Sequence, residues 1–180
     1  MLGSNRLSGV VPKEVWGLKG LKMLDLSSNQ LSGEISADVG GLVNLEALYL
    51  GSNAFGGVIP RELGQCRKLK VLSLCNNRIS GGIPEELGNL PELSYLYLSR
   101  NRLTGGIPGR VCGGLKQLRS LYLNNNELGK QVPVELGDLY YLDSLSLLPN
   151  LGMGKYIPAG ILRGTRVWDL LFRDGFEPLP

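Results

Sequence analysis

The sequence contains no histidine and only three cysteines, and these two scarcities exclude several classes of active site. Without histidine there is no Ser-His-Asp or Cys-His nucleophile system and no histidine ligand for a metal ion. Cys66, Cys75 and Cys112 form no Cys-x-x-Cys pair, so a zinc site or a dithiol redox centre is not indicated. We therefore expect a protein that is not an enzyme and that uses no cofactor or metal.

The sequence also lacks the marks of secretion and of membrane insertion. It has no Asn-x-Ser/Thr glycosylation site, no signal peptide before the first repeat, and no apolar run of about 18 residues that would span a membrane. The odd number of cysteines favours a reducing compartment. For the chain as given, these absences favour an intracellular location, whereas a fragment of a receptor would belong at the cell surface. The net charge of +3 is spread over the chain with no basic stripe, so nucleic acid is not an expected partner.

What the sequence has in abundance is a repeat of 24 residues. One asparagine marks each unit, and the spacing between successive asparagines is 24 residues, with a single interval of 25, across Asn5, Asn29, Asn53, Asn77, Asn101, Asn126 and Asn150. A fixed period of this length predicts a solenoid of stacked coils. We expect a single domain over residues 1–180, made of a truncated first repeat (1–20), five regular repeats (21–44, 45–68, 69–92, 93–117 and 118–141), a degenerate repeat (142–165) and a cap-like segment (166–180).

Each repeat predicts a short strand followed by a turn at the asparagine. Leu69, Leu72 and Leu74 occupy the first, fourth and sixth positions of one unit, where strand alternation directs side chains into the core. One such unit cannot bury its leucines alone, so neighbouring coils close each other's core. The asparagine amide both donates and accepts, and we expect the seven asparagines to form a structural ladder that satisfies buried backbone groups.

The repeating unit LxxLxLxxNxLxGxIPxxLGxL resembles the plant-specific class of leucine-rich repeat, from Gly3 to about Leu162. That class is found in the ectodomains of receptor-like kinases and receptor-like proteins, and in polygalacturonase-inhibiting proteins. The resemblance implies an α/β solenoid: a right-handed superhelix with a concave parallel β-sheet and short helices or 3-10 turns on the convex side. It also implies that the concave sheet binds a protein, a peptide or a glycan.

Aromatic and basic side chains gather at outward-facing strand positions in the C-terminal half of the predicted sheet. Rings and arginines of this kind are enriched at interface hot spots. We predict a partner-binding surface that contains Tyr49, Tyr95, Tyr97, Arg100, Arg119 and Tyr122. Protein or peptide is the favoured partner, and a glycan stacked on the rings is the less favoured one.

Three questions stay open at the level of sequence. The chain is either a free-standing recognition module or a fragment of the ligand-binding ectodomain of a receptor-like kinase or receptor-like protein. An inhibitor of secreted hydrolases is disfavoured, because the cap disulfides and glycosylation sites expected of one are absent. Nothing in the sequence covers the first coil, so either the protein extends upstream or this edge pairs in self-association.

The last residues depart from the repeat, and we expect them to close the end of the solenoid. Val167, Leu170 and Phe172 match the inward positions of one more strand. Trp168, Phe172 and Phe176 would then cover the last coil, and Pro178 and Pro180 would discourage further pairing.

Overall fold

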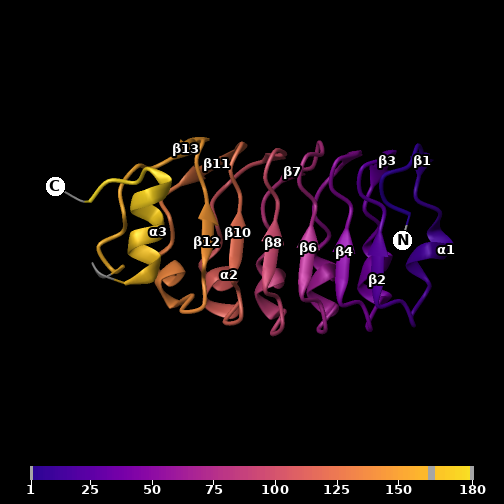
Figure 1. Ribbon diagram of the computed structural model, residues 1–180, viewed down its shortest axis with the longest axis horizontal. Helices are drawn as coiled ribbons and strands as arrows, with labels where there is room; N and C mark the ends of the chain where they lie inside the picture. Colours follow the sequence, from indigo (N-terminus) through magenta and orange to yellow (C-terminus); the bar gives the residue numbers. More distant parts are fainter. Residues whose placement is uncertain (1, 162–164, 179–180) are drawn as a thin grey trace.

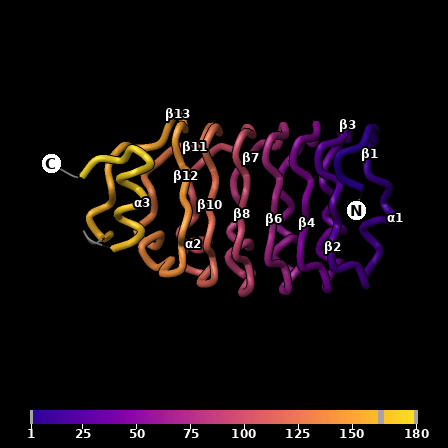
Figure 2. Tube along the Cα trace, viewed as in Figure 1, coloured from indigo at the N-terminus to yellow at the C-terminus, as the bar shows by residue number. Residues whose placement is uncertain are grey.

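The computed structural model is an elongated stack of coils, with the two ends of the chain at opposite ends of the stack (Figure 1). It describes residues 2–161 and 165–178. The path of the backbone rises by one coil per repeat without crossing back on itself (Figure 2). The predicted solenoid is confirmed.

One parallel sheet runs the length of the molecule and forms its concave face. Its six strands follow the order of the repeats and are β2 (Met23–Asp25), β4 (Ala47–Tyr49), β6 (Val71–Ser73), β8 (Tyr95–Tyr97), β10 (Ser120–Tyr122) and β12 (Ser144–Ser146). Each residue faces its equivalent in the next coil, as Leu72 faces Leu96. Positions that share a place in the repeat therefore form straight columns across the sheet.

A second set of short strands follows each turn. They are β1 (Ser8–Val10), β3 (Gln30–Glu34) and β5 (Ala54–Gly56) in one sheet, β7 (Ser80–Gly81) with β9 (Arg102–Leu103), and β11 (Asn126–Lys130) with β13 (Asn150–Met153). Every pairing between these strands is parallel.

The predicted short helices and 3-10 turns lie on the convex side. They are α1 (Lys13–Trp16), η1 (Ala37–Gly41), η2 (Arg61–Gln65), η3 (Glu85–Asn89), α2 (Gly109–Gly114) and η4 (Val134–Asp138). In five of them a proline precedes the first helical residue and fixes the entry of the chain: Pro12, Pro60, Pro84, Pro108 and Pro133. In η1 the hydroxyl of Ser36 takes this place and accepts a hydrogen bond from the amide of Asp38.

The repeated asparagines bridge neighbouring coils. The side-chain amide of Asn53 donates to the carbonyls of Leu26 and Leu50 at 3.0 and 3.1 Å, and its oxygen accepts from the amide of Leu31 at 3.0 Å. The same pattern recurs at Asn29, Asn77, Asn101, Asn126 and Asn150. Asn5 differs, because its side chain bonds only to the nearby carbonyls of Leu2 and Gly3 within the described residues. Six asparagines thus satisfy backbone groups between coils, and the bonds of Asn126 and Asn150 are buried.

The prediction of one more strand near the C-terminus is wrong, because residues 166–174 form a helix. Helix α3 (Arg166–Asp174) begins after Thr165, whose hydroxyl accepts from the amide of Trp168, and ends at Gly175 with a left-handed φ of 102°. Its buried residues Val167 and Leu171 are four positions apart and lie on one helical face. The apolar spacing fits a helix as well as a strand, and the two caps decide between them.

Helix α3 packs against β12 and η4 at the end of the solenoid. Phe176 is buried and Trp168 is half-buried against the core, but Phe172 remains 53% exposed and stacks on Trp168 at 5.4 Å between ring centroids. Phe172 therefore does not cover the last coil as expected. Leu162 and Pro180, named in the sequence predictions, lie outside the described residues.

Candidate recognition surface on the concave sheet

The side chains of two columns point out of the concave sheet, while the leucines between them point into the core. One column holds Met23, Ala47, Val71, Tyr95, Ser120 and Ser144, and the other holds Asp25, Tyr49, Ser73, Tyr97, Tyr122 and Ser146. This separation follows from strand alternation. Ala47 and Ser120 are nonetheless buried, because larger neighbours in the columns cover these small side chains.

Three tyrosines in these columns form one cluster. The ring centroids of Tyr97 and Tyr122 are 5.2 Å apart with an interplanar angle of 51°, and those of Tyr95 and Tyr97 are 6.2 Å apart. Tyr95 and Tyr122 are 37% and 38% exposed, and Tyr97 is half-buried between them. We call these three residues the tyrosine cluster. Strand spacing brings the rings together, and their tilted packing suits the charge distribution of aromatic faces and edges.

Tyr49 lies in the same column but apart from the cluster. The register places Ser73 between Tyr49 and Tyr97, so one whole strand separates the two tyrosines. At the spacing of neighbouring strands, this separation is about 10 Å. Of the predicted rings, Tyr49 is the one that the structure does not bring into contact with the others.

Arg100 occupies a backbone position that arginine seldom takes. Its φ is 56°, close to the values of 54–58° at the equivalent residues Ser28, Ser52, Asn76 and Asn125. The turn before each ladder asparagine requires this left-handed conformation, which serine and asparagine tolerate better than a long side chain. The Arg100 side chain is exposed, and no acidic group pairs with it in the described part of the chain.

Arg119, by contrast, already interacts with side chains of its own chain. Its guanidinium lies 3.5 Å from the carboxylate of Asp143 and 6.0 Å from the ring centroid of Tyr141, and Asp143 also pairs with Arg166. Further along the same edge, Lys70 pairs with Glu46 at 2.8 Å and with Glu92 at 3.9 Å. We call these residues the paired margin: Glu46, Lys70, Glu92, Arg119, Asp143 and Arg166.

Two members of the paired margin shift each other's pKa. The hydrogen bond from Lys70, and then its charge, lower the pKa of the Glu46 carboxyl. The same bond and charge from Glu46 raise the pKa of the Lys70 ammonium. Both groups therefore stay charged at neutral pH and neutralise one another at this edge.

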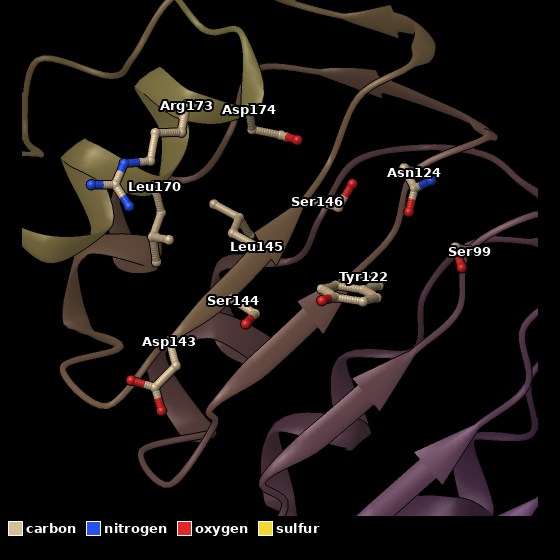
Figure 3. A pocket seen from close by; sticks show the side chains of 10 residues that line it. All are labelled: Ser99, Tyr122, Asn124, Asp143, Ser144, Leu145, Ser146, Leu170, Arg173 and Asp174. Carbon is tan, nitrogen blue, oxygen red and sulfur yellow. The ribbon is translucent and has the colours of Figure 1, made fainter.

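A hollow of about 590 Å³ lies where the concave sheet meets helix α3 (Figure 3). Its lining comes from the ends of β8 and β10, from β12 and from α3, and consists of Ser99, Tyr122, Asn124, Asp143, Ser144, Leu145, Ser146, Leu170, Arg173 and Asp174. Tyr122 thus belongs both to the tyrosine cluster and to this hollow. Sequence reasoning missed the hollow because it assigned a strand to the residues that form α3.

Asp174 joins α3 to the last strand of the sheet. Its carboxylate accepts from the backbone amides of Leu147 and Leu148 at 2.6 and 3.1 Å. Burial raises the pKa of the Asp174 carboxyl, although these two amides and the hydroxyl of Ser146 act in the opposite direction. These bonds hold α3, which forms one wall of the hollow, against the end of β12, which forms its floor.

The three cysteines have free thiols, and two of them are buried away from the concave surface. Cys66 and Cys112 are buried, and desolvation raises the pKa of their thiols to about 11 and about 12. Cys75 is half-buried on the concave face, with its sulfur 3.7 Å from the hydroxyl of Ser73. Among residues 2–161 and 165–178, no three side chains of histidine, cysteine, aspartate or glutamate gather as metal ligands. None of the helices in these ranges is both long and apolar enough to cross a membrane.

Comparison with known families identifies the repeat. One leucine-rich repeat model matches residues 43–103 and again 67–128, and a second leucine-rich repeat model matches residues 20–42. Together they cover residues 20–128, more than half of the chain. No curated protein matches the sequence.

Several solved plant structures share the architecture. The Arabidopsis receptor kinase HAESA, in complex with the peptide hormone IDA and the co-receptor SERK1, is 40% identical with a TM-score of 0.85, over 89% of this chain and 26% of that one. The plant peptide hormone receptor RGFR1, in complex with RGF2, is 37% identical with a TM-score of 0.84, over 87% and 25%. A plant ice-binding protein is 32% identical with a TM-score of 0.72, over 76% and 44%. The chain spans about a quarter of the length of the two receptors.

Proposed function

This chain belongs to the leucine-rich repeat family, and we propose that its concave sheet is a non-catalytic recognition surface for a protein or peptide. The observation that carries the proposal is the tyrosine cluster, which presents three adjoining rings on one side of the sheet. Tyrosine combines a large apolar area with a hydroxyl and few rotatable bonds, and it is enriched among residues that dominate binding energy.

We propose further that the chain is part of the ligand-binding ectodomain of a receptor-like kinase or receptor-like protein, and that it functions outside the cell. The similarity to HAESA bound to IDA and to RGFR1 bound to RGF2 supports this assignment. Because the chain spans about a quarter of those receptors, it would supply only part of such a binding surface.

The chain is also similar to a plant ice-binding protein, so the side chains on the sheet must be used to decide between ice and a protein or peptide as the ligand. A repetitive ligand surface calls for the same side chain on every coil. Here tyrosines stand on β4, β8 and β10, whereas β2, β6 and β12 carry none. This irregular pattern supports a discrete partner.

The predicted residues divide into distinct roles on such a surface. The tyrosine cluster would supply the apolar contact, and Arg100 would supply charged donors for a carbonyl or carboxylate group of the partner. An extended peptide rises about 3.3 Å per residue, so one lying along the solenoid would reach Tyr49 about three residues from Tyr97. Arg119 would act at the edge, since Asp143 and Tyr141 hold its side chain there.

The experiment uses a library of random dodecapeptides displayed on phage and selected on the immobilised protein. Tyr122→Ala removes an exposed ring from the cluster, and Tyr140→Ala removes an exposed ring that contacts no other ring in the described chain. We expect the selected peptides to lose binding to Tyr122→Ala and to keep binding to Tyr140→Ala. A selection that yields no peptide, or only peptides indifferent to Tyr122→Ala, would contradict the proposal.

A further inference from the structure

We propose that the hollow between Tyr122 and helix α3 is a pocket for one uncharged side chain of the partner, with an apolar stem and a hydroxyl or amide tip. This inference rests on the proposed function and specifies the ligand chemistry of the same surface. It follows from which groups face the hollow and from where the charges around it are directed.

The floor of the hollow and the two sides formed by Tyr122 and Leu170 are apolar or neutral. Figure 3 shows the hydroxyls of Ser144 and Ser146 on the floor, the Tyr122 ring on one side and Leu170 of α3 on the other. Leu145 lies between the two serines and is only half-buried. A volume of about 590 Å³ leaves room for one side chain of a partner together with water.

The two carboxylates at the hollow are engaged by groups of the fold itself. Asp143 pairs with Arg119 and Arg166, and it points away from the Tyr122 ring (Figure 3). Asp174 accepts from the amides of Leu147 and Leu148, so its negative charge is used within the fold. Because burial raises the pKa of the Asp174 carboxyl, the fold favours its neutral form and the hollow gains little negative charge from it.

The one remaining charge is turned outward. The guanidinium of Arg173 extends along α3, away from the strands that carry Ser146 and Tyr122 (Figure 3). It makes no ion pair with any described residue, which is consistent with a solvated position on the rim. An anion on the floor would not meet it directly.

The uncharged polar side chains that line the hollow favour a ligand group that is neutral and forms hydrogen bonds. Within the described chain, no hydrogen bond involves the side chains of Ser99, Ser144, Asn124 or Tyr122. Hydroxyls and amides both donate and accept, so a neutral tip can pair with them, while a charged tip would lose water and gain no countercharge. The apolar surface of Leu145 and Leu170 suits the stem of the same side chain.

The rest of the concave floor has the same character. Across the two outward columns, Asp25 is the only charged residue, and its carboxylate accepts from the amide and the hydroxyl of Ser27. The paired margin neutralises itself along one edge. The floor formed by the two columns therefore selects against charge, a form of specificity that works by exclusion.

The test changes the charge of the pocket and asks whether the chosen peptides change with it. Ser144→Lys and Ser144→Asp place opposite charges on the floor, and Ala37→Lys and Ala37→Asp place the same charges at an exposed convex residue. The dodecapeptide library is selected on all four variants and on the unchanged chain. We expect neutral polar residues at the anchoring position for the unchanged chain and both Ala37 variants, acidic residues there for Ser144→Lys, and basic residues for Ser144→Asp.

The two Ser144 variants make the test independent of either one folding poorly, and circular dichroism checks that each keeps its secondary structure. If the unchanged chain selects charged anchoring residues, or if both folded Ser144 variants select the same peptides as the unchanged chain, the pocket assignment is overturned. In that case peptides sensitive to Tyr122→Ala would still support the proposed function. Peptides insensitive to Tyr122→Ala would overturn the proposed function as well.

Discussion

The carboxylate of Asp174 accepts a hydrogen bond from the backbone amide of Leu147 at 2.6 Å. In the inner coils, the equivalent amide donates to a backbone carbonyl of the following coil. The equivalent amides of Leu98 and Leu123 donate to the carbonyls of Tyr122 and Ser146 at 2.9 and 2.8 Å. A side chain of α3 thus satisfies the edge of β12 that would otherwise require another coil. An unpaired strand edge invites association with other chains, and this bond satisfies one of the donors at that edge.

Replacing Asp174 by alanine is expected to destabilise the protein. The change leaves the amides of Leu147 and Leu148 without their acceptor, and since both bonds are partly buried the expected cost is near the lower end of the range for an unpaired amide, about 1 kcal/mol. Asp174→Asn keeps an oxygen acceptor and should cost less. Chemical denaturation measures the free energy of unfolding, with Asp169→Ala, an exposed acid on the same helix, as the control. Equal losses for Asp174→Ala and Asp169→Ala would count against the role of Asp174.

The stability contributed by Asp174 should depend on pH. Because burial raises the pKa of its carboxyl in the folded state, the protonated form is favoured there relative to the unfolded chain. Its contribution is present in full below the ordinary pKa of an aspartate carboxyl, about 3.8, and is lost as the pH rises through the higher folded pKa. The free energy of unfolding, measured from pH 3 to 7, should therefore fall with pH more in the unchanged chain than in Asp174→Asn. Identical pH profiles for the two proteins would contradict this assignment.

The repeat predicted most of the fold, because the period, the leucines and the ladder asparagines constrain every coil in the same way. The same information identified which tyrosines share a column, and the structure places Tyr97 against Tyr122. The sequence analysis did not predict the ion pair between Arg119 and Asp143, although Asp143 occupies the equivalent position one coil later. Considering neighbours in register, and not only residues within one coil, would have indicated that pair.

The region beyond the repeat was harder to predict. Val167, Leu170 and Phe172 suited the inward positions of a strand, while Val167 and Leu171 suit a helical face equally well. The helical signals were Thr165 before the segment and Gly175 after it. The bonds of Asp174 to Leu147 and Leu148 could not be foreseen, because they join segments whose relative placement only tertiary packing decides.

Removing a ladder asparagine from the middle of the stack is expected to be costly. In Asn77→Ala, the amide of Phe55 loses an acceptor, and the carbonyls of Leu50 and Leu74 lose a donor. At about 1–3 kcal/mol for each buried group left unpaired, the protein should lose at least about 1 kcal/mol of stability. Asn5→Ala is the matched control, since Asn5 is exposed and bonds only locally within the described chain. A similar denaturation midpoint for both variants would argue against the ladder.

The three thiols are expected to differ in reactivity. Cys66 and Cys112 are buried with pKa values raised to about 11 and about 12, so almost none of their thiolate is present at neutral pH. Cys75 is half-buried on the concave face and accessible to a small reagent. Treatment of the native protein with iodoacetamide at pH 7.5 should add one group, located at Cys75 by mass spectrometry and absent from Cys75→Ser. Rapid labelling of Cys66 or Cys112 would show that the core opens more readily than its packing implies.

The central claim, that the tyrosine cluster binds a peptide, is tested most directly by the affinity of one selected dodecapeptide, synthesised and titrated calorimetrically. The unchanged chain, Tyr140→Ala and the double variant Tyr97→Ala/Tyr122→Ala are compared, with the thermal unfolding midpoint recorded for each. We expect binding to weaken at least about tenfold in the double variant, to remain unchanged in Tyr140→Ala, and the unfolding midpoints to stay close together. Undiminished affinity in a folded double variant would contradict the account, as would a double variant that has lost its fold.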